Sequence, residues 1–174
     1  DRGRECSSQQ MPFIKDKFPT YKAFASADLN DVYGEELNNA YHLQATDFAS
    51  IFLRNQGNGQ FKLEYLPIEA LTSCINGIVV DDFNEDGRLD ALVAGNLFAS
   101  EVETPRADAG VGVCLLGNGD GSFQPLSVVE SGFFAPGDVK DLKKINLKNK
   151  GKAILVANND AAIQLFQADQ PLIR

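Results

Sequence analysis

Hydrophobic and polar positions divide the chain into a helical beginning and a longer β-rich remainder. After Pro19, apolar residues recur at the period of an α-helix, and one helical face is formed by Tyr21, Phe24, Ala25, Leu29 and Val32. Pro19 and Thr20 suit the start of this helix, and Gly34 suits its end. A second, short helix is expected over residues 35–41.

After His42 the pattern changes to short apolar segments separated by turns rich in Gly and Asn, which predicts β-strands. The expected strands are residues 48–53, 60–66, 75–83, 91–94, 111–116, 122–129, 139–147, 153–157 and 163–166. The glycine-rich turns at 55–59 and 117–121 lack the Gly-Lys-Ser/Thr of phosphate-binding loops and lead into strands. We therefore interpret them as hairpin turns.

An internal repeat connects these strands. Residues 53–61 (LRNQGNGQF) align with residues 115–123 (LLGNGDGSF) at an offset of 62. Residues 92–96 (LVAGN) align with residues 155–159 (LVANN) at an offset of 63. Two matches at nearly the same period indicate one unit of four strands that is used repeatedly.

The repeat predicts a mainly β fold with a propeller-like segment of two to three incomplete blades. Residues 71–132 hold a full blade with all four strands, residues 48–70 only the last two and residues 133–174 only the first three. Near-continuous apolar runs suit inner blade strands covered on both faces. We expect residues 1–47 to form a helical segment packed on the sheet. A closed ring needs roughly four to eight blades, and a two-sheet sandwich is the structural alternative.

The loop between the first two strands of the full blade carries the chemistry that the sequence marks most clearly. Alternating residues provide oxygen atoms, Gly87 allows a tight turn, and this layout is typical of a loop that binds a hard cation. The expected ligands are Asp82, Asn84, Asp86, the carbonyl oxygen of Arg88 and Asp90. The loop is not an EF-hand, because the twelfth position counted from Asp82 is Val93 and the flanking segments are strands.

Charge density favours a bound Ca²⁺ over the alternative of a solvated acidic turn without metal. Arg88 is the only cation among the acidic residues Asp81, Asp82, Glu85, Asp86 and Asp90. Like charges ~4–5 Å apart repel by a few kcal/mol at an effective dielectric near 20. Ca²⁺ suits this many protein oxygens better than Mg²⁺ does. Lysines at the equivalent place in the third unit, residues 146–152, predict no second site there.

Composition excludes some classes of partner. The net charge of −8 and a pI of about 4.6 argue against nucleic-acid binding. No apolar run approaches the ~18 residues of a membrane span. The chain opens on Asp1 without a signal-peptide pattern, so we expect its natural start to lie upstream. Cys6, Cys74 and Cys114 have no metal-binding spacing and are expected to be buried free thiols, with a Cys6–Cys74 disulfide as the alternative.

The motifs resemble those of a known family. Residues 82–90 (DFNEDGRLD), followed by an apolar strand, and residues 116–123 (LGNGDGSF) are similar to the FG-GAP/VCBS repeats of integrin α-subunit propellers and of secreted bacterial proteins. Residues 4–14 (RECSSQQMPFI) look like the C-terminal region of large bacterial VCBS-repeat proteins of the ASPIC type. The third unit departs from the repeat pattern.

This resemblance implies a seven-bladed type of propeller, calcium in the loop at residues 82–90, an extracytoplasmic location (periplasmic, secreted or cell-surface) and a binding role. It supports the five loop ligands and no other residues.

We therefore expect a non-catalytic calcium-binding module that binds a protein or a carbohydrate. The long connection 97–110 is the candidate ligand-binding segment through Glu101, Glu103, Arg106 and Asp108. One alternative is a glycan-acting enzyme with paired carboxylates. The chain, however, has no nucleophile elbow, no HExxH motif and a single histidine, His42. The other alternative is a structural C-terminal part of a larger propeller, which would self-associate through open blade edges.

Overall fold

The computed structural model describes residues 3–101, 104–148 and 151–167. The chain divides into two compact units, Asp1–Thr46 and Asp47–Arg174. Glu103, one of the expected ligand-binding residues, lies outside the described residues. The expected packing of the helical segment on a sheet stays a prediction. Within the described residues, no helix is both long enough and apolar enough to cross a membrane.

The first unit is a set of short helices. They are α1 (Arg4–Gln10), α2 (Phe13–Lys17), α3 (Tyr21–Ala25), α4 (Leu29–Tyr33) and the 3₁₀-helix η1 (Gly34–Asn39). Its small core consists of Ile14, Phe18 and Val32. This core is continued by the edge-to-face contact between the rings of Phe18 and Phe24, whose centroids lie 5.7 Å apart.

The single helix predicted from Pro19 to Gly34 is wrong, because two helices occupy this segment. Thr20 caps α3 as expected, but Asp28 then starts a new helix through a capping box with Asp31. Of the predicted apolar face, Val32 is buried, whereas Tyr21 and Leu29 are each 65% exposed. The sequence did not predict α1 and α2, since helices of 7 and 5 residues are too short to establish a period.

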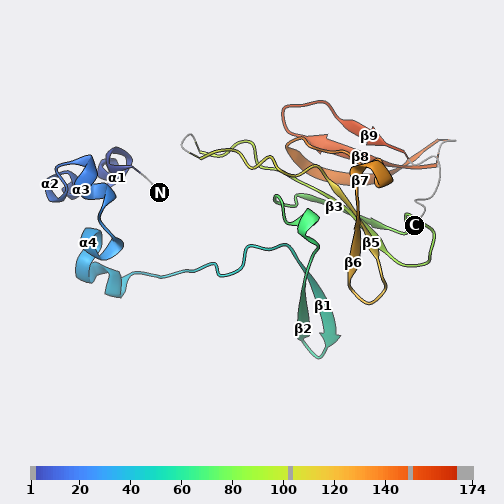
Figure 1. Cartoon of the computed structure of the whole chain (residues 1–174), viewed down its shortest axis with the longest axis horizontal. Coiled ribbons are helices and arrows are strands. Elements are labelled where there is room, and N and C mark those ends of the chain that lie inside the picture. Colours follow the sequence, from blue (N-terminus) through green and yellow to red (C-terminus); the bar gives the residue numbers. More distant parts are fainter. Residues whose placement is uncertain (1–2, 102–103, 149–150, 168–174) are drawn as a thin grey trace. The chain divides into compact units, whose positions relative to one another are not determined.

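The second unit contains three antiparallel sheets, each with its strands in chain order (Figure 1). The first sheet has β1 (Ile51–Gly57) and β2 (Gln60–Tyr65). The second has β3 (Gly77–Asp81), β4 (Asp90–Ala94), β5 (Val113–Gly117) and β6 (Phe123–Leu126), and the third has β7 (Val139–Leu147), β8 (Gly151–Asn158) and β9 (Gln164–Phe166). Two, four and three strands are the numbers that the sequence predicted for the three units.

The main core lies between the second and third sheets. Its largest contributors from the two sheets are Val79, Leu92, Leu116, Val139, Leu142, Ile154 and Val156. The closest approach is at Gly77 of β3, where an added Cβ would lie 2.7 Å from both the Cγ and the backbone nitrogen of Leu142 in β7. Only glycine allows β3 and β7 to pack at this distance.

The burial expected for inner strands is confirmed for β4, holds only in part for β8 and is wrong for β3. Every residue of β4 and β5 is buried. In β3, Val79 is buried against the third sheet, but Ile78 and Val80 are 58% and 51% exposed. One face of β3 is therefore open.

Two further expectations also need correction. The strand predicted over 122–129 ends at Leu126, because Ser127 caps the short helix α5 (Val128–Ser131) through a capping box with Glu130. Of the three cysteines only Cys114 is buried, while Cys74 is exposed and Cys6 is half-buried. Burial raises the pKa of the Cys114 thiol to about 12, so this side chain acts as a small apolar core residue.

A fully buried amide joins the second and third sheets at the end of β4. Nδ2 of Asn96 donates to the carbonyl oxygens of Gly110, Pro136 and Gly137 at 2.8–3.1 Å. Its Oδ1 accepts from the backbone N–H of Gly110 at 3.0 Å. Asn96 thus fixes the connection into β5 and the segment before β7 to the same point.

Candidate metal centre

The connection between β3 and β4 folds into a compact loop over residues 82–89. Gly87 has φ +83°, a conformation that side-chain-bearing residues rarely adopt, and Glu85 adopts φ +58°. These two residues reverse the chain, so that β3 and β4 pair as far as Asp81 opposite Asp90. The expected tight turn is present at the predicted glycine.

Side-chain oxygens of two expected ligands, Asp82 and Asn84, meet inside this loop, while the Asp86 carboxylate accepts from the Asn84 amide at 2.9 Å. Oδ1 of Asp82 and Oδ1 of Asn84 both accept from the backbone N–H of Asp86, at 3.0 and 3.2 Å. The other oxygen of Asp82 accepts from the N–H of Gly87 at 2.8 Å. Each oxygen keeps a further lone pair. Side chains two residues apart thus direct oxygen atoms toward one small volume, which is the geometry that a cation loop requires.

Arg88 contributes a positive charge to the same loop. Its guanidinium donates through Nη2 to Oδ2 of Asp86 and through Nε to the carbonyl oxygen of Gly117 at 3.0 Å. A cation held by Asp86 would share this carboxylate with Arg88 or displace the guanidinium from it. The expected ligand from Arg88 is its backbone carbonyl, which this arrangement of the side chain does not involve.

Asp90, the fifth expected ligand, is fully buried and closes the neck of the loop. Its Oδ2 accepts from the backbone N–H of Phe83 at 2.9 Å. Its Oδ1 accepts from the N–H of Gly117 at 2.8 Å. The carboxylate therefore ties the beginning of the loop to the end of β5, with one lone pair left on each oxygen.

Gly117 is a residue of this site that the sequence did not single out. It donates to Asp90 and accepts from Arg88, and a Cβ at this position would collide with the carbonyl oxygen of Leu89. The repeat alignment could have indicated this role. The position equivalent to Gly117 in the first unit is Asn55, and glycine therefore occurs in the unit that has the acidic loop and not in the unit that lacks it.

The lysines of the third unit contact the acidic end of β3. Nζ of Lys144 and Nζ of Lys152 each lie 3.0 Å from Oδ2 of Asp81, whose side chain is 16% exposed. Burial by itself would raise the pKa of Asp81, but the two ammonium groups outweigh it and hold the pKa below its ordinary value. Two lysines of the third unit, one in β7 and one in β8, therefore supply positive charge to the acidic end of β3.

We expect Asp81→Asn to lower the free energy of unfolding by about 1 kcal/mol at pH 7. A carboxylate with a lowered folded-state pKa stabilises the fold above its unfolded pKa, and this contribution is lost as the pH falls below about 4. Urea unfolding from pH 7 to pH 3 measures the difference between the two proteins. Asp108→Asn, which removes an exposed carboxylate paired with Arg106, serves as the control. An equal effect at pH 3 and pH 7 would contradict this assignment.

The candidate ligand-binding connection 97–110 folds back on itself and extends from the sheet (Figure 1). The backbones of Leu97 and Ala107 pair at 2.9 and 2.8 Å. Arg106 lies over the ring of Phe98, 4.6 Å from its centroid, and donates to Asp108 at 2.7 Å. Glu101 accepts from the Thr104 hydroxyl at 3.1 Å. Glu101, Arg106 and Asp108 are exposed, and these contacts join Arg106 to Asp108 but not to Glu101.

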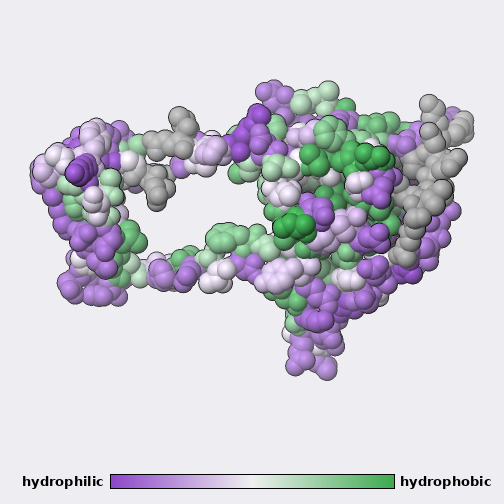
Figure 2. All heavy atoms as spheres, viewed as in Figure 1, coloured by the Kyte–Doolittle hydropathy of each residue, from purple (hydrophilic) through white to green (hydrophobic). Residues whose placement is uncertain are grey.

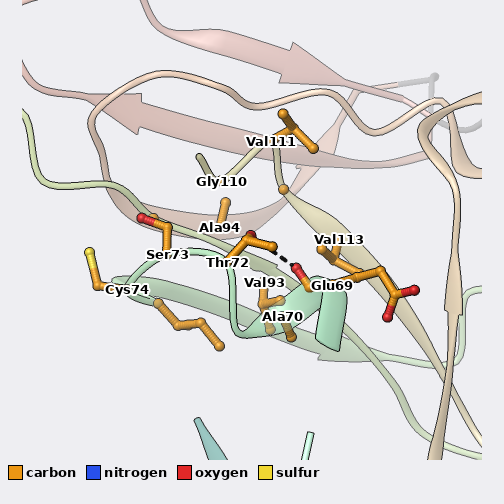
Figure 3. Close-up of a pocket in the computed structure, with 13 residues that line it drawn as sticks. Glu69, Ala70, Thr72, Ser73, Cys74, Val93, Ala94, Gly110, Val111 and Val113 are labelled. Carbon is orange, nitrogen blue, oxygen red and sulfur yellow. Dashed lines mark hydrogen bonds between the residues drawn. The ribbon is translucent and has the colours of Figure 1, made fainter. Parts of the chain in front are cut away.

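A small cavity beneath η2 (Ile68–Ala70) has too little space for a substrate. Its volume is about 20 Å³, enough for roughly one water molecule. Figure 3 shows Ala70, Val93 and Val113 on its inner side, with Thr72 hydrogen bonded to the carbonyl of Glu69 at its rim. The buried Ser73 hydroxyl finds no partner among the described residues. This cavity suits a buried water better than a ligand.

In the part of the chain that the structure describes, no group of three or more His, Cys, Asp and Glu side chains is placed to hold a metal ion. In the loop 82–90, one carboxylate oxygen of Asp82 and the amide oxygen of Asn84 meet at the N–H of Asp86, whose own carboxylate accepts from the Asn84 amide and from Arg88. Comparison with known proteins finds no matching family model, curated protein or solved structure.

Proposed function

We propose that this chain is a non-catalytic calcium-binding module of the FG-GAP/VCBS type, in which loop 82–90 holds Ca²⁺. The observation that carries the proposal is that Asp82 and Asn84 direct side-chain oxygens to one backbone N–H of a loop whose neck is closed by Asp90, with the Asp86 carboxylate next to the Asn84 amide. The Arg88 carbonyl and the remaining lone pairs of Asp90 would complete the ligand set. The ion would neutralise the acidic loop and hold β3 and β4 together at their ends.

In this proposal the ion stabilises the fold and takes no part in a reaction. The carboxylates around it are occupied by backbone N–H groups and by Arg88, which suits a structural site. A weak site, with a dissociation constant in the range of about 10⁻⁴ to 10⁻³ M, would be filled outside the cytoplasm. The proposed location is therefore extracytoplasmic.

We also propose that the three sheets are consecutive, incomplete blades of a β-propeller. The support is the repeat of about 62 residues together with sheets of two, four and three strands in chain order. The binding partner would be a protein or a carbohydrate, contacted through the exposed connection 97–110. Loss of binding in Arg106→Ala and Glu101→Ala variants, tested on a glycan array, would support this segment.

Calcium is expected to raise the free energy of unfolding by about 2.7 kcal/mol at one hundred times its dissociation constant. This corresponds to a rise in Tm of roughly 5–10 °C for a chain of this size. Melting curves after chelation, with and without added CaCl₂, measure the shift.

Matched variants identify the site. Asp86→Asn removes an expected ligand and should abolish the calcium-dependent shift. Glu85→Gln removes one charge from the same loop at an exposed side chain outside the ligand set, and it should retain most of the shift. Absence of a shift in the unmodified protein, or an equal loss in both variants, would refute the assignment.

A further inference from the structure

The open face of β3 is the unusual feature of the second sheet. Ile78 lies opposite Val93 and Val80 opposite Ala91, so these four side chains share one face of the sheet. Val93 and Ala91 are buried, whereas Ile78 and Val80 are more than half exposed. The same face is thus covered over β4 and open over β3.

The hairpin β1–β2 covers only the outer part of this face. The ring of Phe52 in β1 contacts the ring of Phe123 in β6 edge to face, with the centroids 5.7 Å apart. The guanidinium of Arg54 lies against Gly121 in the turn between β5 and β6, where an added Cβ would collide with it. Figure 2 shows hydrophobic surface exposed above the hydrophilic tip of this hairpin.

A groove of about 660 Å³ remains between β1 and the open face of β3. Its apolar lining includes Ile51, Phe52, Leu66, Ile78, Val80 and Leu89. Strand β1 borders the groove, and among the strands that the structure describes it pairs with β2 alone. Alternate N–H and C=O groups on its other edge therefore have no partner strand among the described residues. The groove therefore combines an apolar surface, formed mainly by side chains of β3 and β1, with backbone hydrogen-bonding groups along the edge of β1.

The opposite face of β3 is covered by a pair of strands, which indicates the kind of structure that could cover the open face. There the first strand of the third sheet, β7, packs on β3, and β8 pairs with β7. The second and third sheets both contain the first two strands of the repeat. The first sheet lacks them, since its first strand, β1, corresponds to the third strand of the repeat, β5. Two strands side by side would fill about 10 Å next to β1.

We propose that this groove is a docking site for a two-stranded antiparallel β-ribbon, which pairs with the free edge of β1 and packs apolar side chains on Ile78 and Val80. The ribbon completes a four-stranded sheet over the second one. This inference rests on the repeated-blade part of the proposed function and is independent of calcium. Arg54 and Arg88 also line the groove, but they are paired with Glu64 and Asp86, so the facing side of the ribbon is expected to be apolar or neutral.

The chain itself provides a probe. A fluorescently labelled peptide of residues 75–95 contains the first two strands of the complete sheet and has an acidic loop. Its binding to the full chain is measured by anisotropy in EDTA and 150 mM salt, so that calcium plays no part. We expect saturable binding, and protection of the β1 amides of Ile51, Leu53 and Asn55 from hydrogen exchange.

Two lysine substitutions make the test specific. Val80→Lys places a charge on the apolar surface of the groove and should weaken binding at least about tenfold, since a buried apolar contact is lost. Because Val80 is half exposed in the free chain, the variant should fold normally. Val129→Lys, at a 94% exposed position on α5, should bind like the unmodified protein.

Several results would overturn the inference. They are no binding at about 1 mM peptide, equal binding by both lysine variants, and protection at β6, β9 or the helical unit instead of β1. Sedimentation showing a dimer that Val80→Lys dissociates would identify a second copy as the occupant and also overturn the ribbon. Peptide binding in EDTA without any calcium-dependent melting shift would leave this inference standing and refute the metal assignment alone.

Discussion

Replacing Asp90 by Ala is expected to lower the free energy of unfolding of the β-sheet unit by about 3–5 kcal/mol. The fully buried carboxylate accepts from the backbone N–H groups of Phe83 and Gly117, and a hydrogen bond to a charged group contributes about 1.5–3 kcal/mol. Alanine has no acceptor, so both donors would lose their partner. Urea unfolding followed by circular dichroism measures the loss.

Asp90→Asn is the matched control for this prediction. The amide keeps one acceptor oxygen but presents an NH₂ group to the other backbone donor, so about half of the loss is expected. Both measurements are made in EDTA, which separates the hydrogen bonds from any bound cation. A loss below about 1 kcal/mol in Asp90→Ala would show that water replaces the carboxylate.

Asn96→Ala is expected to destabilise the same unit by about 3 kcal/mol, because it removes a buried amide whose two N–H groups are shared among three carbonyl oxygens and whose oxygen accepts one N–H. The carbonyl oxygens of Gly110, Pro136 and Gly137 and the N–H of Gly110 would lose this partner. Net contributions of about 1 kcal/mol for each of the two N–H groups and for the oxygen give this magnitude. Chemical denaturation measures it.

Two comparisons sharpen the Asn96 prediction. Asn96→Asp should be at least as damaging, since a carboxylate cannot donate to three carbonyl oxygens. Asn118→Ala, at an exposed asparagine in the turn before β6, removes one hydrogen bond to Ser122 and should cost under about 1 kcal/mol. Similar losses at positions 96 and 118 would show that the buried amide does not join the sheets.

The success of the strand predictions follows from local patterning. The predicted strand over 139–147 has the bounds of β7, and the strand predicted over 91–94 differs from β4 by one residue. The failures lie where a short polar residue offers the backbone a local alternative. Asp28 and Ser127 each begin a helix by capping it, within segments predicted as one helix and one strand.

Part of the candidate site could also be predicted. Asp82, Asn84 and Asp86 are two residues apart, so a tight turn at Gly87 brings these side chains into one loop without help from the rest of the chain. Gly117 could not be found in this way. It meets the loop from 27 residues further along the chain, through a contact that exists only once β5 pairs with β4.

By itself, the sequence determined the mainly β class, the division of strands among three sheets and the position of the acidic loop. These features depend on side-chain periodicity and on turn residues, which act over a few positions. Only the tertiary structure decided that Asp90 is a buried acceptor and that Asn96 is a buried amide whose NH₂ donates. It also decided that Lys144 and Lys152 form ion pairs with Asp81, and that β3 is open on one face. Those outcomes depend on which sheet packs against which. They arise from contacts between residues far apart in the chain, and the pattern of neighbouring residues does not specify such contacts.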